Sequence, residues 1–174
     1  MAVYALGKIQ PEENLEELKV ALEDEVPDIR KVALEAVAGL CDTHGEGMNL
    51  LVSRLSDESR EVRLAVVEQI GKCSLAEGSE YLIQALDDPD DWVRIRAMEA
   101  LGQRMDERAI PHLIGLLESP NTLLALKVIE TLGEIGGKTS FRALLDILGK
   151  DDPELSAAAE EAIAKIQDEH GEDR

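Results

Sequence analysis

Leucine recurs along this chain with a period of 31 to 33 residues. One column of leucines comprises Leu18, Leu51, Leu82, Leu113 and Leu144, and a second column follows four residues later, at Leu22, Leu55, Leu86, Leu117 and Leu148. A third, aliphatic column, in which each residue is followed by Gly or Ala, comprises Leu6, Val37, Ile70, Leu101, Leu132 and Ile163. A fixed period of this length is typical of repeat proteins, in which each unit buries its apolar face against its neighbours.

Within each unit the spacing of apolar residues predicts a short helix, a turn and a longer helix. We expect short helices at about 14–23, 47–56, 78–87, 107–118 and 139–149. We expect longer helices at about 27–40, 59–72, 90–104, 121–135 and 153–167, with a helix fragment at 2–9. Breakers and capping residues, as in DDPDD and ESPN, separate these helices. The sequence therefore predicts an all-α fold.

We predict one α-solenoid (superhelix) of about five helix pairs over residues 1–167, followed by an acidic flexible tail at 168–174. The expected repeats are about 10–41, 42–74, 75–105, 106–136 and 137–167. The chain starts halfway through a second helix, whereas the last helix carries Glu160 at a place that is apolar in the other repeats. A polar outer face is typical of a terminal capping repeat. We therefore hypothesise that the chain is the C-terminal part of a longer repeat protein.

The segment LDDPDDWVRIRAMEALGQRMDERAIPHLIGLL, which begins at Leu86, resembles the HEAT-like repeat of the phycobilisome-lyase type. In that pattern Asp-x-x-x-x-Val-Arg opens the second helix, Ala-Leu-Gly closes it, and Ala-Ile-Pro-x-Leu starts the next unit. The match covers about residues 2–167, but repeats four and five have Ala125 and Ser156 in place of the Arg. The resemblance implies an α-solenoid, with armadillo-like architecture, whose second helices line a concave surface that binds other proteins.

Two further activities are suggested by resemblance. Bilin lyase subunits, which attach tetrapyrroles to proteins, make a lyase-like or other enzyme-associated role the alternative to a scaffold. HEAT-like DNA glycosylases need a basic groove, whereas this chain has a formal charge of −19. Such a charge repels a phosphate backbone, so we expect no nucleic-acid partner.

Few residues offer catalytic or metal-binding chemistry. The stretch GEIGGKTS, at 133–140, lacks the spacing of a phosphate-binding loop, and we interpret it as a turn between repeats whose glycines end a helix and allow close packing. Cys41 and His44 have C-x-x-H spacing, but no fourth zinc ligand is near them in the repeat register. No nucleophile, base and acid can be assembled. We expect no catalytic residue, no cofactor and no metal, and therefore no enzyme.

The cysteine content and the hydropathy bear on localisation. Cys41 and Cys73 give no disulfide framework, suit a reducing cytosol, and are interpreted as buried thiols. No apolar run is long enough to span a membrane. We expect a cytoplasmic protein without a membrane partner. We also expect a monomer, with association through the open N-terminal end as the alternative.

A ladder of paired charges recurs at the start of three longer helices. It comprises Asp24 with Arg30, Asp57 with Arg63, and Asp88 with Arg94, always six residues apart. Aspartates near helix starts cap the backbone, and arginines make bidentate contacts with carboxylates. We interpret the ladder as structural, with the arginines bracing neighbouring repeats.

A candidate partner-binding surface lies on the longer helices, opposite their buried stripe. Every longer helix carries a glutamate five residues after the Arg position, and these are Glu35, Glu68, Glu99, Glu130 and Glu161. The competing explanation is that Glu is an excellent helix former. We expect the row to make an acidic concave face that binds a protein or peptide with basic segments.

Two adjacent repeats interrupt this acidic face. Trp92 and Leu123 stand where other repeats are mostly acidic, and Arg96 and Lys127 follow one turn later. An aromatic anchor beside an Arg has the composition of a binding hot spot, although single exposed apolar residues are also ordinary. We predict that these four residues and the five glutamates bind the partner.

Overall fold

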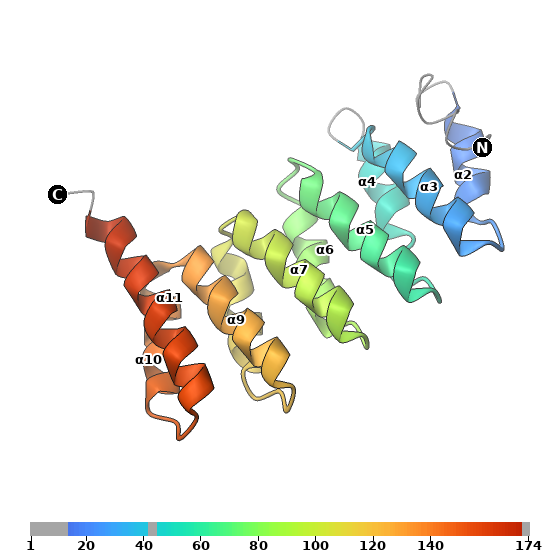
Figure 1. The fold of residues 1–174 in the computed structure, drawn as a ribbon. Helices are drawn as coiled ribbons and strands as arrows, with labels where there is room; N and C mark the ends of the chain where they lie inside the picture. Colours follow the sequence, from blue (N-terminus) through green and yellow to red (C-terminus); the bar gives the residue numbers. More distant parts are fainter. Residues whose placement is uncertain (1–13, 42–44, 172–174) are drawn as a thin grey trace. The chain divides into compact units, whose positions relative to one another are not determined.

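The chain is folded into α-helices and short 3-10 helices in the computed structural model, which describes residues 14–41 and 45–171 (Figure 1). The described residues contain no β-strand. Two compact units, Met1–Ala97 and Met98–Arg174, have their boundary within one helix, α7 (Asp91–Gln103). The predicted helix fragment at 2–9 and the open N-terminal end lie outside the described residues.

The first unit consists of helix pairs in two layers (Figure 1). The pairs are α2 (Leu15–Leu22) with α3 (Pro27–Ala38), α4 (Gly45–Val52) with α5 (Arg60–Lys72), and α6 (Gly78–Gln84), extended by the 3-10 helix η1 (Ala85–Asp87), followed by α7. The longer helices α3 and α5 pack against each other in one layer, and the shorter helices form the other. This is the arrangement of an α-solenoid.

The second unit continues the same alternation. Its elements after α7 are η2 (Glu107–Ala109) with α8 (Ile110–Leu116), then α9 (Thr122–Ile135), α10 (Gly137–Leu148) and α11 (Pro153–Gly171). The longer helices α9 and α11 pack against each other, and α10 packs against both. All these helices begin and end within a few residues of their predicted bounds, except that α11 continues to Gly171 although a tail is predicted from 168. Because neither Pro nor Gly occurs between 154 and 170, the helix can continue beyond its predicted end.

The repeat columns form the core of each unit. All five leucines of the first column have no exposed side-chain surface in the first unit, at Leu18, Leu51 and Leu82, and in the second, at Leu113 and Leu144. The aliphatic column is equally buried at Val37, Ile70, Leu101 and Leu132. Burying a Leu or Ile side chain contributes about 1.5–3 kcal/mol, so these columns supply the main stabilisation. The second leucine column ends at the surface, where Leu148 is 37% exposed.

The turns between helices show why the capping residues recur. Asp24, Asp57 and Asp88 each accept a hydrogen bond from the backbone N–H two residues later, at 2.8, 2.9 and 2.9 Å. These bonds satisfy backbone donors before the longer helices begin.

The stretch GEIGGKTS is an inter-repeat turn, as predicted. Gly136, with φ of 71°, ends α9 in a conformation that favours glycine. Gly133 allows close packing, because a Cβ there would lie 2.9 Å from the Cβ of Ala162.

Candidate functional site

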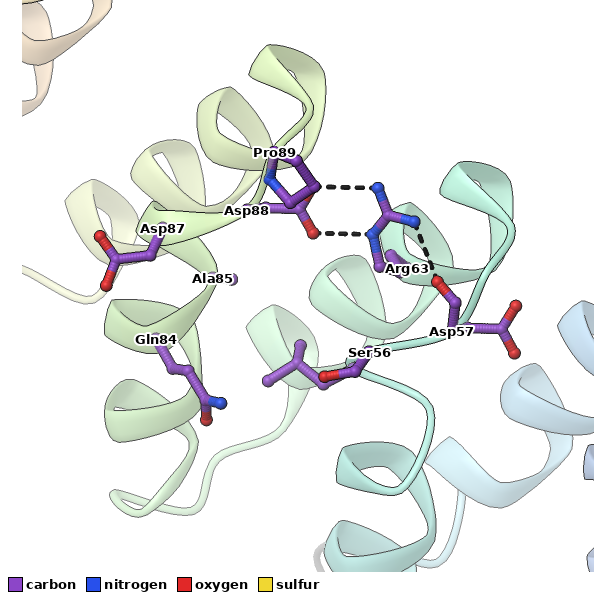
Figure 2. Close-up of a pocket in the computed structure, with 9 residues that line it drawn as sticks. Ser56, Asp57, Arg63, Gln84, Ala85, Asp87, Asp88 and Pro89 are labelled. Carbon is purple, nitrogen blue, oxygen red and sulfur yellow. Dashed lines mark hydrogen bonds and ion pairs between the residues drawn. The ribbon is translucent and has the colours of Figure 1, made fainter.

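A buried and a half-buried arginine join consecutive repeats in the first unit. Arg30, in α3, donates from Nη2 to Oδ1 of Asp57 and from Nη1 to the carbonyl of Asp24, both at 2.7 Å. Arg63, in α5, donates to both carboxylate oxygens of Asp88 at 2.8 and 3.1 Å, and to the carbonyl of Asp57 at 2.9 Å (Figure 2). Each arginine therefore bonds to the turn of its own repeat and to the aspartate of the next, which confirms the predicted bracing.

The electrostatics of these arginines follow from their partners. The hydrogen bond to Asp57 raises the pKa of Arg30 and outweighs burial, which acts to lower it. The bond to Asp88 raises the pKa of Arg63 in the same way. A hollow of 480 Å³ lies beside the Arg63 pair (Figure 2). Because its arginine already bonds to its aspartates, we assign this hollow a structural role.

The ladder changes at its third step. Arg94 is bonded to Asp91 of its own helix, and both side chains are partly exposed, at 24% and 35%. The place that would hold the next aspartate in the repeat register is Ser119. The sequence therefore has no carboxylate at that place to continue the ladder.

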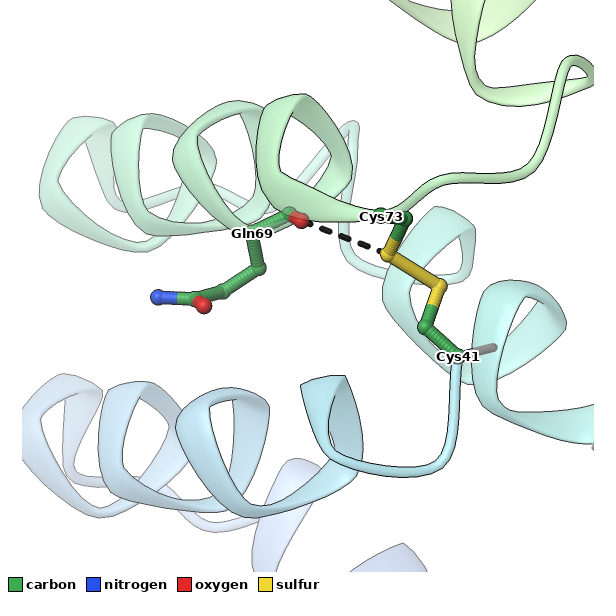
Figure 3. Close-up of a disulfide and its surroundings, with 3 residues drawn as sticks. All are labelled: Cys41, Gln69 and Cys73. Carbon is green, nitrogen blue, oxygen red and sulfur yellow. Dashed lines mark hydrogen bonds between the residues drawn. A yellow bond between two sulfur atoms is a disulfide. The ribbon is translucent and has the colours of Figure 1, made fainter. Parts of the chain in front are cut away.

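The two cysteines are paired, contrary to the prediction of free thiols. Cys41, which follows α3, and Cys73, at the C-terminal end of α5, form a disulfide with their Cα atoms 6.0 Å apart (Figure 3). Both are buried, as predicted. The prediction failed because it rested on the small number of cysteines, whereas stacking brings nearly equivalent places of consecutive repeats together. Disulfides are rare in cytosolic proteins, so the cysteines no longer support a cytoplasmic localisation.

The exposed side of the longer helices, which we call the second-helix face, carries the predicted glutamates. Four are exposed, namely Glu35, Glu68, Glu130 and Glu161, and Glu99 is half-buried. None of them lies in the core, so the register used to place them is consistent with the structure. Whether they bind a partner stays a prediction.

In the first unit, the second-helix face contains a groove of 540 Å³ between α3 and α5. It is lined by Lys31, Glu35, Glu61, Leu64, Ala65, Glu68, Gln69 and Lys72. Lys72 bonds to Glu68 at 2.7 Å, and this bond, together with the charges of Lys72 and Arg96, lowers the pKa of Glu68 despite the opposing effect of burial. Lysines of the groove itself therefore offset much of its acidic charge.

In the second unit, a larger hollow of 750 Å³ lies between α9 and α11. It is lined by Leu126, Ile129, Glu130, Gly133, Glu134, Ala158, Glu161, Ala162, Ala164, Lys165 and Asp168. Its lining combines an apolar floor with predicted site residues Glu130 and Glu161. We call it the α9/α11 hollow.

Lys127 is part of an ion-pair network in the second unit. Its Nζ lies 3.0 Å from Glu130 and 3.4 Å from Glu99. Burial acts to lower the pKa of Lys127, but the bonds and charges of Glu130 and Glu99 outweigh it, so the pKa is raised. Lys127 thus neutralises part of the charge of two predicted site glutamates. From the sequence, Lys127 was predicted only to interrupt the acidic face, because the ion pairs depend on side-chain positions.

Trp92 and Leu123 are exposed, at 57% and 51% of their surface. Trp92 lies in the first unit and Leu123 in the second. Each lies two residues after a capping residue whose side chain accepts a hydrogen bond from its backbone N–H. The acceptors are Oδ1 of Asp90 at 2.9 Å and Oδ1 of Asn121 at 3.1 Å. Arg96, one turn after Trp92, is exposed and acts electrostatically on Glu68. The two apolar side chains are available to a partner, but their role in binding stays a prediction.

Within the described part of the chain, no cluster of three or more His, Cys, Asp or Glu side chains has the geometry to hold a metal ion. No helix there is long and apolar enough to cross a membrane.

Comparison with known proteins shows what this architecture resembles. The family model for HEAT repeats matches residues 48–125. Curated proteins give no match to the chain.

Solved structures show the same fold over nearly the whole chain. The complex of CpcE and CpcF of phycocyanin lyase from Nostoc sp. PCC7120 is similar with a TM-score of 0.68 and 22% identity, over 91% of this chain and 67% of the matched one. Human deoxyhypusine hydroxylase matches with a TM-score of 0.63 and 22% identity, over 95% and 66%. A designed armadillo repeat protein in complex with the peptide (KR)4 matches with a TM-score of 0.58 and 19% identity, over 95% and 90%.

At these identities the likeness establishes a HEAT and armadillo-like fold. It assigns this chain neither a reaction nor a partner.

Proposed function

We propose that this HEAT-repeat chain is a protein-interaction scaffold that binds a basic segment of a partner along its second-helix face. The observation that carries the proposal is the glutamate at one register position of all five longer helices, four of them exposed and none buried. A row of like charges on a repeat surface favours a partner of opposite charge and speeds its association.

Three further observations support the proposal. The net charge of −19 attracts basic partners to the molecule as a whole. A designed armadillo repeat protein of similar fold is in complex with the peptide (KR)4, so a solenoid of this kind is compatible with a basic peptide ligand. Trp92 and Leu123 would add exposed apolar contacts of the kind that dominate interface energetics.

The test is titration of a fluorescent lysine- and arginine-rich peptide, at two salt concentrations, into the protein and into a variant with the five glutamates changed to Gln. We expect binding that weakens with salt and that the variant largely loses. The control is a variant in which exposed glutamates of the shorter helices, Glu17, Glu46 and Glu80, become Gln. Equal weakening in both variants would show that net charge alone attracts the peptide, and would refute the second-helix face.

A second candidate is a lyase-like, enzyme-associated subunit. The structural likeness to the CpcE and CpcF complex favours it. The test is to mix the protein with phycocyanobilin and record the absorbance spectrum. A shifted or sharpened bilin band would support this candidate, and an unchanged spectrum would leave the scaffold.

A further inference from the structure

The two grooves of the second-helix face differ in what they can bind. Of the residues that line the α3/α5 groove, Leu64 and Ala65 are the two apolar ones, and two lysines stand among its glutamates. The α9/α11 hollow has six apolar or glycine residues in its lining and one lysine, Lys165. The first groove is therefore polar, and its lysines compensate part of the negative charge of its glutamates, whereas the hollow has an apolar floor.

Close packing of small residues makes this floor. Ala162 is 6% exposed and lies directly against Gly133, where a Cβ would come within 2.9 Å of it. Ala158 and Ala164 add little volume at the edges of the hollow, while the half-buried Leu126 supplies apolar surface from α9 and Ile129 is fully buried beneath it. The resulting space of 750 Å³ can accept a long side chain lying flat along the helices.

The rim of the hollow is acidic. Glu130, Glu161 and Asp168 line it and are exposed. Glu134 adds less to the rim, because its carboxylate occupies the space that a Cβ at Gly102 would fill.

These rim carboxylates differ in how far they are already neutralised. Glu130 is paired with Lys127 at 3.0 Å, whereas in the described part of the chain no ion pair involves Glu161 or Asp168. The α9/α11 hollow therefore keeps carboxylate charge that a ligand can neutralise.

We infer that the α9/α11 hollow binds an arginine side chain from an extended segment of the partner. The aliphatic stem would lie on the floor at Gly133 and Ala162, and the guanidinium would reach Glu161 at the rim. Arginine suits this site better than lysine because its planar head is weakly hydrated and pairs with carboxylates in a bidentate manner. The inference rests on the proposed function and names the side chain that is recognised and the place where it binds.

The experiment measures fluorescence anisotropy with a labelled peptide in which arginine alternates with alanine. Matched peptides carry lysine, or citrulline, which has the shape of arginine without its charge. The protein variants are Glu161→Gln, which removes rim charge, and Ala158→Leu, which fills the hollow and keeps all charges. Glu160→Gln is the control, because Glu160 is exposed on the same helix as Glu161 but does not line the hollow.

We expect Glu161→Gln to weaken arginine-peptide binding about three- to fivefold, as for a partly exposed ion pair. Ala158→Leu should weaken it about tenfold by excluding the stem, and Glu160→Gln should change it less than about twofold. The citrulline peptide should bind about tenfold more weakly or worse, and the lysine peptide should fall between. Circular dichroism verifies that each variant is folded. If Ala158→Leu does not fold, Glu161→Gln still tests the arginine site, because Glu161 is exposed.

The outcomes separate this inference from the proposed function. If the arginine peptide binds but Glu161→Gln and Glu160→Gln have equal effects, the hollow is not the arginine site and the scaffold proposal stands. Lysine binding as tight as arginine would overturn the choice of side chain. If neither basic peptide binds the unaltered protein, both the inference and the proposed function are wrong.

Discussion

Removing Arg30 should destabilise the first unit far more than removing Arg94, although both hold the same register position. Arg30 is 4% exposed, and the Asp57 side chain that it bonds to is 3% exposed. In Arg30→Ala, the Asp57 carboxylate would keep only the backbone N–H of Ser59 as a donor, at 2.9 Å. The carbonyl of Asp24 would also lose a donor. Breaking a buried pair by removing one partner costs about 3–5 kcal/mol.

Arg94 gives the matched control. Its partner Asp91 lies one turn away on the same helix, and both side chains are partly exposed. Such a pair is worth about 0.3–0.5 kcal/mol. The two Arg→Ala variants should therefore differ by about 2.5 kcal/mol or more in the free energy of unfolding.

Urea unfolding followed by far-UV circular dichroism measures this difference, provided that both variants unfold with similar m-values. Adding Asp57→Asn to Arg30→Ala should restore part of the loss, because no uncompensated buried charge then remains. Equal destabilisation by Arg30→Ala and Arg94→Ala would refute the bracing role. So would a double variant less stable than Arg30→Ala alone.

Three further predictions concern the disulfide, the tryptophan and a surface ion pair. Breaking the bond of Cys41 and Cys73, which spans 32 residues, by Cys41→Ser should cost about 3–4 kcal/mol; melting that does not respond to reductant would contradict the pairing. Trp92→Ala should change stability by less than about 0.5 kcal/mol, because the ring is largely exposed; a markedly lower melting temperature would show that it is structural. Lys72→Met should return the pKa of Glu68 upward, as carboxyl NMR titration would show, and an unchanged pKa would exclude the pair.

The stability contributed by the ion pair of Glu68 with Lys72 depends on pH in a defined way. The folded-state pKa of Glu68 is lowered, so its contribution to stability is present above the unfolded-state pKa. That contribution is lost as the pH falls through the folded-state pKa. Because the side chain of Glu68 is 49% exposed, solvent keeps the effect small.

The helices could be predicted because the information for them is local and repeated. Apolar spacing, Asp caps and glycines occur within each unit, and five copies fix the register of positions such as Leu18 and Leu51. The same register placed Glu35 and Trp92 on the exposed side of their helices. Where one feature appears once, as at the end of α11, the prediction was less accurate.

Contacts between side chains of different repeats were harder to predict. The disulfide depends on the distance between Cys41 and Cys73, which requires knowing how the ends of α3 and α5 approach. The partial neutralisation of Glu99 and Glu130 depends on the reach of Lys127. The α9/α11 hollow depends on two small residues in contact across helices, a feature that no single repeat reveals.

The most direct test of the account is to map the arginine peptide onto the protein by backbone amide NMR. If the second-helix face is the binding surface, the shifts that saturate with peptide should fall on the longer helices α3, α5, α9 and α11. The largest should surround the α9/α11 hollow, near Gly133 and Glu161. Saturating shifts confined to the shorter helices α2, α4, α8 and α10 would contradict the central claim that the longer helices bind the partner.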